Sequence, residues 1–102
     1  MTYVVIARWT AKAGNEETVD AVLRQLAEAS RRESGCLQYL ANRSLDDPCV
    51  FVLYEEYVDE SAYRAHADSE HFARLAVGDG IPLLESRERE FFSALSPPAD
   101  DL

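Results

Sequence analysis

The segment from Cys49 to Val58 is the feature that most limits what this chain can fold into. It is rich in β-branched and aromatic residues and carries two glutamates near its end, a composition typical of a strand rather than a helix. Successive side chains of a strand point to opposite faces of its sheet. One face holds Phe51, Leu53, Glu55 and Tyr57, and the other holds Val50, Val52, Tyr54 and Glu56. Both faces are largely apolar, so the sheet needs cover on both sides.

The preceding residues predict two more strands and a helix. Residues 2–10 are rich in valine, isoleucine and aromatic residues and form the first strand. A helix over residues 16–33 follows Asn15 as its N-cap and ends at Ser34-Gly35. Residues 36–44 form the second strand, and Leu45 to Pro48 form a turn that sets Ser44 opposite Cys49. The inner stripe of the helix is Val19, Val22, Leu23, Leu26, Ala27 and Ser30.

The following residues predict two helical segments and a fourth strand. Asp59 caps a short helix that carries Ala62, Tyr63 and His66, and Ser69 restarts a turn or two with Phe72, Leu75 and Ala76. Residues 78–82 are expected to be a loop, and Arg87 to Leu95 the last strand. The order βαββαβ predicts an α+β, ferredoxin-like fold with helices on one face of an antiparallel sheet.

The predicted organisation is one domain over residues 1–95 and a flexible C-terminal tail over 96–102. The uncovered sheet face, Val50-Val52-Tyr54-Glu56, predicts a homodimer that pairs sheet to sheet. The net charge of −9 and the pI near 4.5 exclude nucleic acid as a partner, because binding to phosphates requires clustered Lys and Arg. Since there is no signal-like segment and no apolar run of about 20 residues, we expect no membrane association and a cytoplasmic location.

The two cysteines are predicted to be reduced. With Ser44 opposite Cys49, Cys36 falls opposite Tyr57, which separates the thiols by about 25 Å at the rise of a strand. A disulfide needs Cα atoms within about 7 Å of each other. No metal-ligand spacing such as CxxC is present, so no metal site is predicted.

The residues suited to chemistry at neutral pH are Glu55 and His66. Glu55 would have a raised pKa if its strand face meets the helices; alternatively it lies at the strand end, facing water or an arginine. His66 shares a helix face with Ala62, four residues earlier, and is either a base or a core or dimer-interface histidine bonded to a backbone carbonyl. His71 is expected at the surface. Arg43 is predicted to be a solvated charge at the end of its strand, with contact to an anion as the alternative. Residues 85–90 are predicted to form a solvated edge.

An ordered set of motifs resembles a known family. The motifs are Ser30-Arg31-Arg32-Glu33-Ser34-Gly35-Cys36-Leu37-Gln38-Tyr39, Asp47-Pro48, Phe51-Val52-Leu53-Tyr54-Glu55, Ala62-Tyr63-xx-His66 and Ser69-xx-Phe72. Together, from about Tyr3 to Ala76, they resemble the antibiotic biosynthesis monooxygenase (ABM) family, specifically its small quinol-monooxygenase-like members. The resemblance implies a dimeric α/β barrel and oxygenation of hydroquinone- or anthrone-like compounds without metal or organic cofactor. Relatives with other activities include a signalling-molecule isomerase and haem degraders.

Two departures from the family pattern are informative. Haem-degrading relatives have an asparagine on the first strand and a haem-ligating histidine about one turn beyond the position of Phe72. Here the first strand reads VVIAR and the later position is Ala76, which disfavours haem degradation. Tyr57 stands where many members have tryptophan, a change that alters pocket shape without removing the pocket.

The resulting hypothesis is a cofactor-free monooxygenase that uses O₂ on a small phenolic or quinone-like compound. His66, polarised by Glu55, or Glu55 itself would be the base. Isomerisation of a small hydroxy-ketone and non-catalytic binding by a dimeric module are the alternatives. The predicted substrate-binding residues are Phe51, Leu53, Tyr57, Tyr63, Phe72 and Tyr39.

Overall fold

Strands and helices follow one another along the chain as predicted. The computed structural model describes residues 1–96, so the predicted tail lies outside the described residues except for Ser96. The elements are β1 (Tyr3–Ala11), α1 (Glu16–Arg31), β2 (Cys36–Arg43), β3 (Val50–Tyr57), α2 (Glu60–Ala67), the π-helix η1 (Phe72–Gly80), the 3₁₀-helix η2 (Ile81–Leu83) and β4 (Leu84–Ser93).

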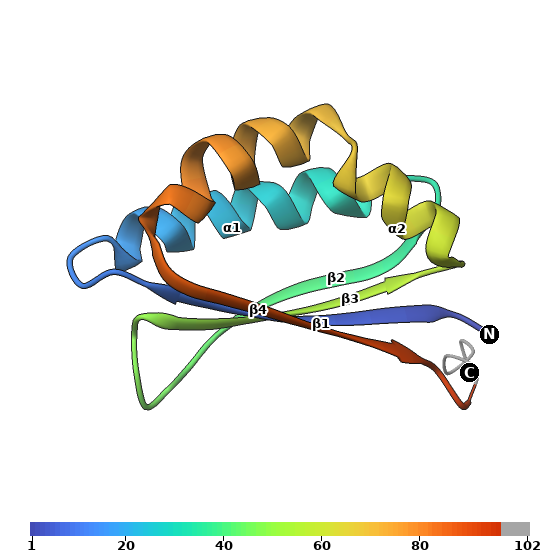
Figure 1. The fold of residues 1–102 in the computed structure, drawn as a ribbon, viewed down its shortest axis with the longest axis horizontal. Helices are drawn as coiled ribbons and strands as arrows, with labels where there is room; N and C mark the ends of the chain where they lie inside the picture. Colours follow the sequence, from blue (N-terminus) through green and yellow to red (C-terminus); the bar gives the residue numbers. More distant parts are fainter. Residues whose placement is uncertain (97–102) are drawn as a thin grey trace.

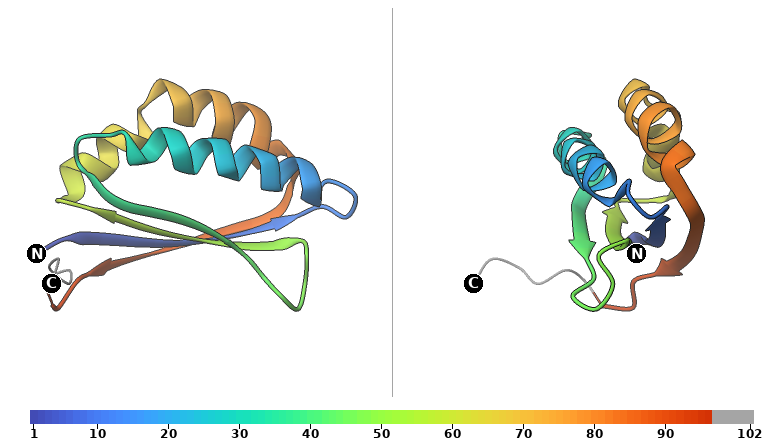
Figure 2. Two further views of the ribbon diagram at one scale, coloured as in Figure 1. Left: turned by 180° about the vertical axis from the view of Figure 1, so that it is seen from behind. Right: turned by 90° about the vertical axis from the view of Figure 1, so that its left-hand side faces the viewer.

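The four strands form one antiparallel sheet in the order β2-β3-β1-β4. The helices all lie on one face of this sheet, and two perpendicular views show the other face without helical cover (Figures 1 and 2). This arrangement confirms the predicted α+β, ferredoxin-like fold. The homodimer remains a prediction. Within residues 1–96, no helix combines the length and the apolarity that crossing a bilayer would require.

The core lies between α1, η1 and the covered sheet face. All six residues of the predicted α1 stripe are buried, and so are all four residues of the predicted inner face of β3. The core is tightly packed at Gly80, the last residue of η1, where an added Cβ would come within 2.9 Å of the Trp9 ring. Alternation on β3 and the helical period of α1 therefore located the core correctly.

The β2–β3 hairpin differs from its predicted register. Arg43 pairs with Phe51, and the amide of Ser44 donates to the carbonyl of Val50, so the register is shifted by one residue near the turn. An irregularity between Cys36 and Gln38 absorbs the shift, and Cys36 therefore still lies opposite Tyr57. A bulge of this kind inserts one extra residue into one strand. Both cysteines are free, as predicted.

Three local predictions were wrong or imprecise. Asn15 occupies the N-cap position of α1, but its side chain makes no capping hydrogen bond; instead Glu16 Oε1 accepts from the Gly14 amide at 2.7 Å. Residues 78–82 are helical rather than a loop, because packing of this segment on α1 and Trp9 outweighs the poor helix propensity of its glycines. The last strand begins at Leu84, three residues before the predicted start.

Candidate active site

His66 is buried on the inner side of α2. The helix begins at Asp59, whose side chain accepts a hydrogen bond from the Ala62 amide at 2.9 Å. Its first turn packs directly on Gly35, where an added Cβ would lie 2.5 Å from Ala62 Cβ. Only glycine permits this approach, which brings the turn after α1 against α2. The His66 side chain, 1% exposed, thus reaches residues from that turn.

Glu33 is the direct partner of His66. Its Oε2 atom lies 2.8 Å from His66 Nδ1 and 2.5 Å from His71 Nε2. An ionised carboxylate only accepts hydrogen bonds, so both ring nitrogens donate to it. A neutral His66 then carries its proton on Nδ1 and presents an unprotonated Nε2 on the other side of the ring. His71, predicted to be a surface residue, belongs to this cluster instead.

Glu55 faces the helices of the same chain and not the open side of the sheet. It is 4% exposed, and its Oε1 accepts a hydrogen bond from the Tyr57 hydroxyl at 2.7 Å. Burial raises the pKa of Glu55, while the bond from Tyr57 and the proximity of His66 partly oppose the rise. Its Oε1 lies 3.9 Å from His66 Nε2, beyond hydrogen-bond distance. Glu33, not Glu55, therefore orients His66 in this structure.

Two buried tyrosines beside His66, Tyr39 and Tyr57, keep their hydroxyl protons at neutral pH. Burial raises the pKa of Tyr39 and of Tyr57 well above the usual range, and the charge of Glu55 adds to both shifts. Their rings lie 5.5 and 5.4 Å from the His66 ring, centroid to centroid. Tyr57 can therefore act as a donor to Glu55 but not as a base. Because Glu33 is engaged by both histidines, His66 and Glu55 are the proton acceptors that line the cavity.

A small cavity of about 10 Å³ adjoins His66 and Glu55, a volume close to that needed by one water molecule. Two of its lining residues, Trp9 and Arg87, carry buried N–H donors, Nε1 and Nε, without a hydrogen-bond partner among the described residues. The Arg87 guanidinium lies over the rings of Trp9 and Phe72, and burial together with the nearby Arg89 lowers its pKa. The prediction of a solvated edge over residues 85–90 was thus wrong for Arg87.

The predicted substrate-binding residues fall into three groups. Tyr39, Leu53, Tyr63 and Phe72 line the cavity with His66 and Glu55. Tyr57 supports Glu55 from one side. Phe51 lies farther along β3 and lines a separate groove between α1 and β2, under the guanidinium of Arg43.

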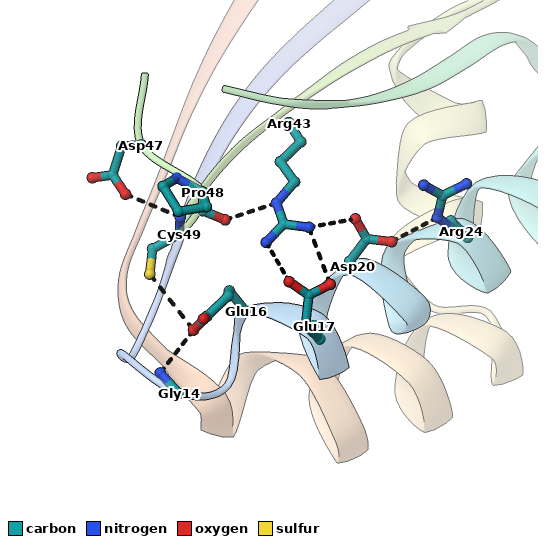
Figure 3. A network of polar contacts seen from close by, with 9 residues as sticks. All are labelled: Gly14, Glu16, Glu17, Asp20, Arg24, Arg43, Asp47, Pro48 and Cys49. Atoms are coloured by element: carbon teal, nitrogen blue, oxygen red, sulfur yellow. Dashed lines mark hydrogen bonds and ion pairs between the residues drawn. The ribbon is translucent and has the colours of Figure 1, made fainter. Parts of the chain in front are cut away.

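Arg43 is fully engaged within the fold. Its guanidinium pairs with Glu17 at 3.0 Å and with Asp20 at 3.1 Å, and its Nε donates to the carbonyl of Pro48 (Figure 3). These contacts tie the end of β2 to the first turns of α1. Arg43 is therefore a structural clamp rather than a free strand-end charge or an anion site.

The cluster of Glu33, His66 and His71 is also a possible metal-ligand set. One ligand atom from each residue lies within 4.8 Å of the others, and zinc accepts imidazole and carboxylate donors. Donor atoms around tetrahedral zinc stand about 3.3 Å apart, given bond lengths near 2 Å. The 2.8 Å between Glu33 and His66 is instead a hydrogen-bond distance. A metal would have to spread these groups apart.

Comparison with known proteins decides the family. The profile described as antibiotic biosynthesis monooxygenase matches residues 2–77. The chain belongs to the ABM family. No curated protein matches it significantly.

Solved structures of the same fold are similar to this ABM protein along nearly its whole length. PA3566 from Pseudomonas aeruginosa is 33% identical, covers 93% of this chain and 95% of its own, and has a TM-score of 0.86. A protein from Nitrosomonas europaea is 28% identical over 96% and 94% of the two chains, with a TM-score of 0.89. A solved antibiotic biosynthesis monooxygenase is 29% identical over 92% and 99%, with a TM-score of 0.85.

Besides His71, three residues of this ABM site were not predicted from the sequence as participants: Glu33, Arg87 and Trp9. Glu33 is separated from His66 by 33 positions and stands in a turn, where no periodicity applies. Arg87 sits in a run of alternating charges that is usually solvated. The one available signal was the place of Glu33 inside the motif that resembles the family, just before Gly35.

Proposed function

We propose that this ABM protein is a cofactor-independent monooxygenase that oxidises a small electron-rich phenol or quinol with O₂, acting in the cytoplasm as a homodimer. The observation that carries the proposal is the Glu33–His66 pair, in which His66 lines the cavity and Glu33 bonds to His66 Nδ1. Glu33 fixes the proton of His66 on Nδ1, so Nε2 is the atom available to take a proton. A base oriented by a carboxylate is a recurring arrangement in enzymes.

The first step would be removal of the hydroxyl proton of the substrate by His66 Nε2. The imidazolium that forms is stabilised by the Glu33 carboxylate, 2.8 Å away. The phenolate then passes one electron to O₂, which gives a substrate radical and superoxide. Their recombination forms a C–O bond at the ring carbon para to the oxygen, and the product is a peroxide anion.

The second step returns the proton. His66 protonates the peroxide, and loss of the C–H proton from the same carbon breaks the O–O bond to give a carbonyl and water. A phenol and O₂ thus yield a quinone and H₂O, and no external reductant is needed. One oxygen atom enters the product and the other leaves as water.

The unpaired donors of the cavity suit the anions of this sequence. Phenolate, superoxide and peroxide all carry negative charge on oxygen, and Arg87 offers a positive charge and a free Nε–H. Trp9 offers a second free donor, Nε1–H. Donors fixed in advance where negative charge develops supply a large part of enzymatic rate enhancement. Leu53 and Phe72 provide apolar walls that keep water from the radical pair.

Isomerisation of a hydroxy-ketone would use the same base without O₂. The donors of Trp9 and Arg87 that have no partner within residues 1–96 favour oxygenation, because that reaction forms several oxyanions in succession. Consumption of O₂ is the measurement that separates the two reactions. We expect the dimer to form through the sheet face that has no helical cover. On β3 this face holds Val52 and Tyr54, which are partly exposed, and Val50 and Glu56, which are already buried within the single chain.

The test is oxygen uptake by chelator-treated, flavin-free protein with anthrone and 1-naphthol, together with ¹⁸O₂ labelling of the product. We expect uptake with incorporation of one labelled atom, and a loss of about 10² to 10⁴ in rate for His66→Ala. Arg43→Met, in the separate clamp, should keep the rate of the wild type. Absence of uptake across electron-rich phenols, or unchanged uptake in His66→Ala, would refute the proposal.

A further inference from the structure

The buried cavity adjoins an open groove. The cavity of about 10 Å³ is too small for an aromatic ring, whereas the groove, between α2 and the ends of β1 and β4, measures about 420 Å³. Tyr63 and Arg89 line both spaces. They are joined by a hydrogen bond of 2.8 Å from Arg89 Nη1 to the Tyr63 hydroxyl. This bond stands where the groove meets the cavity.

The groove has an aromatic wall. The rings of Tyr3, Tyr63 and Phe91 lie within 5.5 to 5.9 Å of one another, centroid to centroid, and Phe91 is 46% exposed. Planar aromatic ligands stack or pack edge-on against such rings. An accessible wall of three rings at the mouth of an enclosed cavity is therefore suited to holding a flat ring before it enters.

The charges at the groove favour a neutral ligand. Arg64 is paired with Glu60 at 2.6 Å, and Asp68 also lines the groove, so two carboxylates balance the two guanidinium groups. The remaining specific contact is that between Arg89 and Tyr63, in which a guanidinium already binds a phenolic hydroxyl. The contact shows that Arg89 can bind a phenolic hydroxyl group, and we expect the groove to bind the hydroxyl of a phenolic ligand in the same way.

We propose that this groove is the entrance and first binding site for a neutral phenolic substrate, whose hydroxyl replaces that of Tyr63 on Arg89 and so releases the Tyr63 ring from the mouth of the cavity. The Tyr63 ring lies 6.3 Å from the His66 ring, centroid to centroid, so its displacement opens a direct route to the base. We call the hydrogen-bonded pair of Tyr63 and Arg89 the gate. The identity of the ligand rests on the proposed function, but the existence of the gate does not.

Trp9 reports on the gate without any turnover. It is the single tryptophan of the chain, is 1% exposed and lines the cavity. Quenching of its fluorescence by the neutral molecule acrylamide should be slow in the wild type. Tyr63→Phe and Arg89→Met both remove the hydrogen bond between these residues, and Tyr63→Phe keeps the aromatic ring. Each variant should raise the quenching constant about tenfold, because one hydrogen bond to a charged group contributes a free energy of about that size.

Arg64→Met is the matched control for that experiment. It removes a guanidinium from the same groove but leaves the bond between Tyr63 and Arg89 intact, so quenching should stay at the wild-type value. Circular dichroism and thermal melting of each variant verify that the fold persists. The gate is overturned if quenching is unchanged in both bond-breaking variants, or if it rises equally in Arg64→Met.

Ligand recognition is tested with 4-nitrophenol and with 4-nitrotoluene, in which a methyl group replaces the acceptor oxygen, at a pH where the phenol is neutral. Quenching of Trp9 gives the affinity of each. The wild type should bind the phenol about tenfold more tightly relative to the toluene than Arg89→Met does, because only the wild type donates a hydrogen bond to the phenol oxygen. An equal preference for the phenol in the wild type and in Arg89→Met would overturn the role of Arg89. Oxygen uptake plays no part in either experiment, so failure of the oxygenase proposal is recognised separately.

Discussion

Two clusters of arginines and acids occupy different places in this fold and differ in how their charges are paired. Around Arg43, Glu17 and Asp20, every contact joins a donor to an acceptor near the surface, and Asp20 also holds Arg24 (Figure 3). Around the cavity, within residues 1–96, the Nε–H of Arg87 has no hydrogen-bond partner, and Glu55 is buried with no arginine or lysine paired to it.

This difference separates a structural cluster from a functional one. Charges that find partners and water cost the fold little and contribute modestly to its stability. Buried donors left unpaired cost free energy, and such a cost is often associated with a group reserved for a ligand or a reaction. Residue type alone does not distinguish the clusters, since both contain glutamate and arginine. Their burial and pairing do.

The largest expected effect is on turnover in Glu33→Gln. The amide can donate to His66 Nδ1 as well as accept from it, so the proton of His66 is no longer fixed on that atom, and the imidazolium loses its counter-charge. We expect the oxygenation rate to fall by up to about 10⁴-fold, the scale seen when the orienting carboxylate of a catalytic histidine becomes an amide. Steady-state oxygen uptake measures it.

Glu17→Gln is the control, because it makes the same change in the Arg43 cluster. Its rate should match that of the wild type. A comparable loss in both variants would mean that the measured effect comes from general destabilisation rather than from the orientation of His66.

A smaller effect on turnover is expected for Arg87→Met. The methionine fills similar space but supplies neither charge nor donor to an anionic intermediate, and the loss of one such donor costs about 10² in rate. Since the guanidinium is partly buried and its Nε–H donates no hydrogen bond within residues 1–96, thermal stability should be unchanged or higher. A lowered melting temperature with normal turnover would mean that Arg87 stabilises the fold and has no part in the reaction.

Arg43→Met should give the reverse pattern. Loss of the clamp between β2 and α1 is expected to lower the melting temperature by about 3 °C, the scale of a surface ion-pair network in a domain of this size. Added salt should shrink the difference from the wild type, because screening weakens the pairs. Turnover should be unaffected. Thermal melts at low and high salt, with oxygen uptake on the same samples, check all three points.

The sequence predicted the fold better than it predicted the site. Alternation on β3 and the spacing of apolar residues on α1 are local patterns, and burial follows from them directly. The bulge in β2 and the helical course of residues 78–82 depend on packing between distant segments, so local propensity predicted neither.

The site required contacts that no local pattern contains. His66 and Glu55 were identified because a titratable residue on an apolar face is unusual. Their relation was not predicted, since Glu33 reaches His66 only where Gly35 lets the turn after α1 meet α2. Arg87 was hidden for a similar reason: on an edge strand of alternating charges, one side chain folds inward toward Trp9 and Phe72.

The smallest expected effect is a change in the pH dependence of stability in Glu55→Gln. Burial raises the pKa of Glu55 above its value in the unfolded chain, so the folded state holds this proton more tightly. The wild type therefore loses stability as the pH rises from the ordinary glutamate range through the raised pKa. Glutamine keeps an oxygen for the Tyr57 hydroxyl but does not ionise. The variant should gain stability relative to the wild type across that range, as measured by urea unfolding at a series of pH values.

Asp20→Asn provides the opposite case from the other cluster. The hydrogen bond and charge of Arg24, followed by Arg43, lower the pKa of Asp20, so the folded state favours its ionised form. Stability from Asp20 is present above the ordinary aspartate range and is lost as the pH falls through the lowered pKa. The asparagine variant should thus be less stable than the wild type near neutrality and equal to it in acid. If the two variants diverge from the wild type in the same direction, burial and pairing do not distinguish the clusters as argued, and Glu55 is an ordinary structural acid.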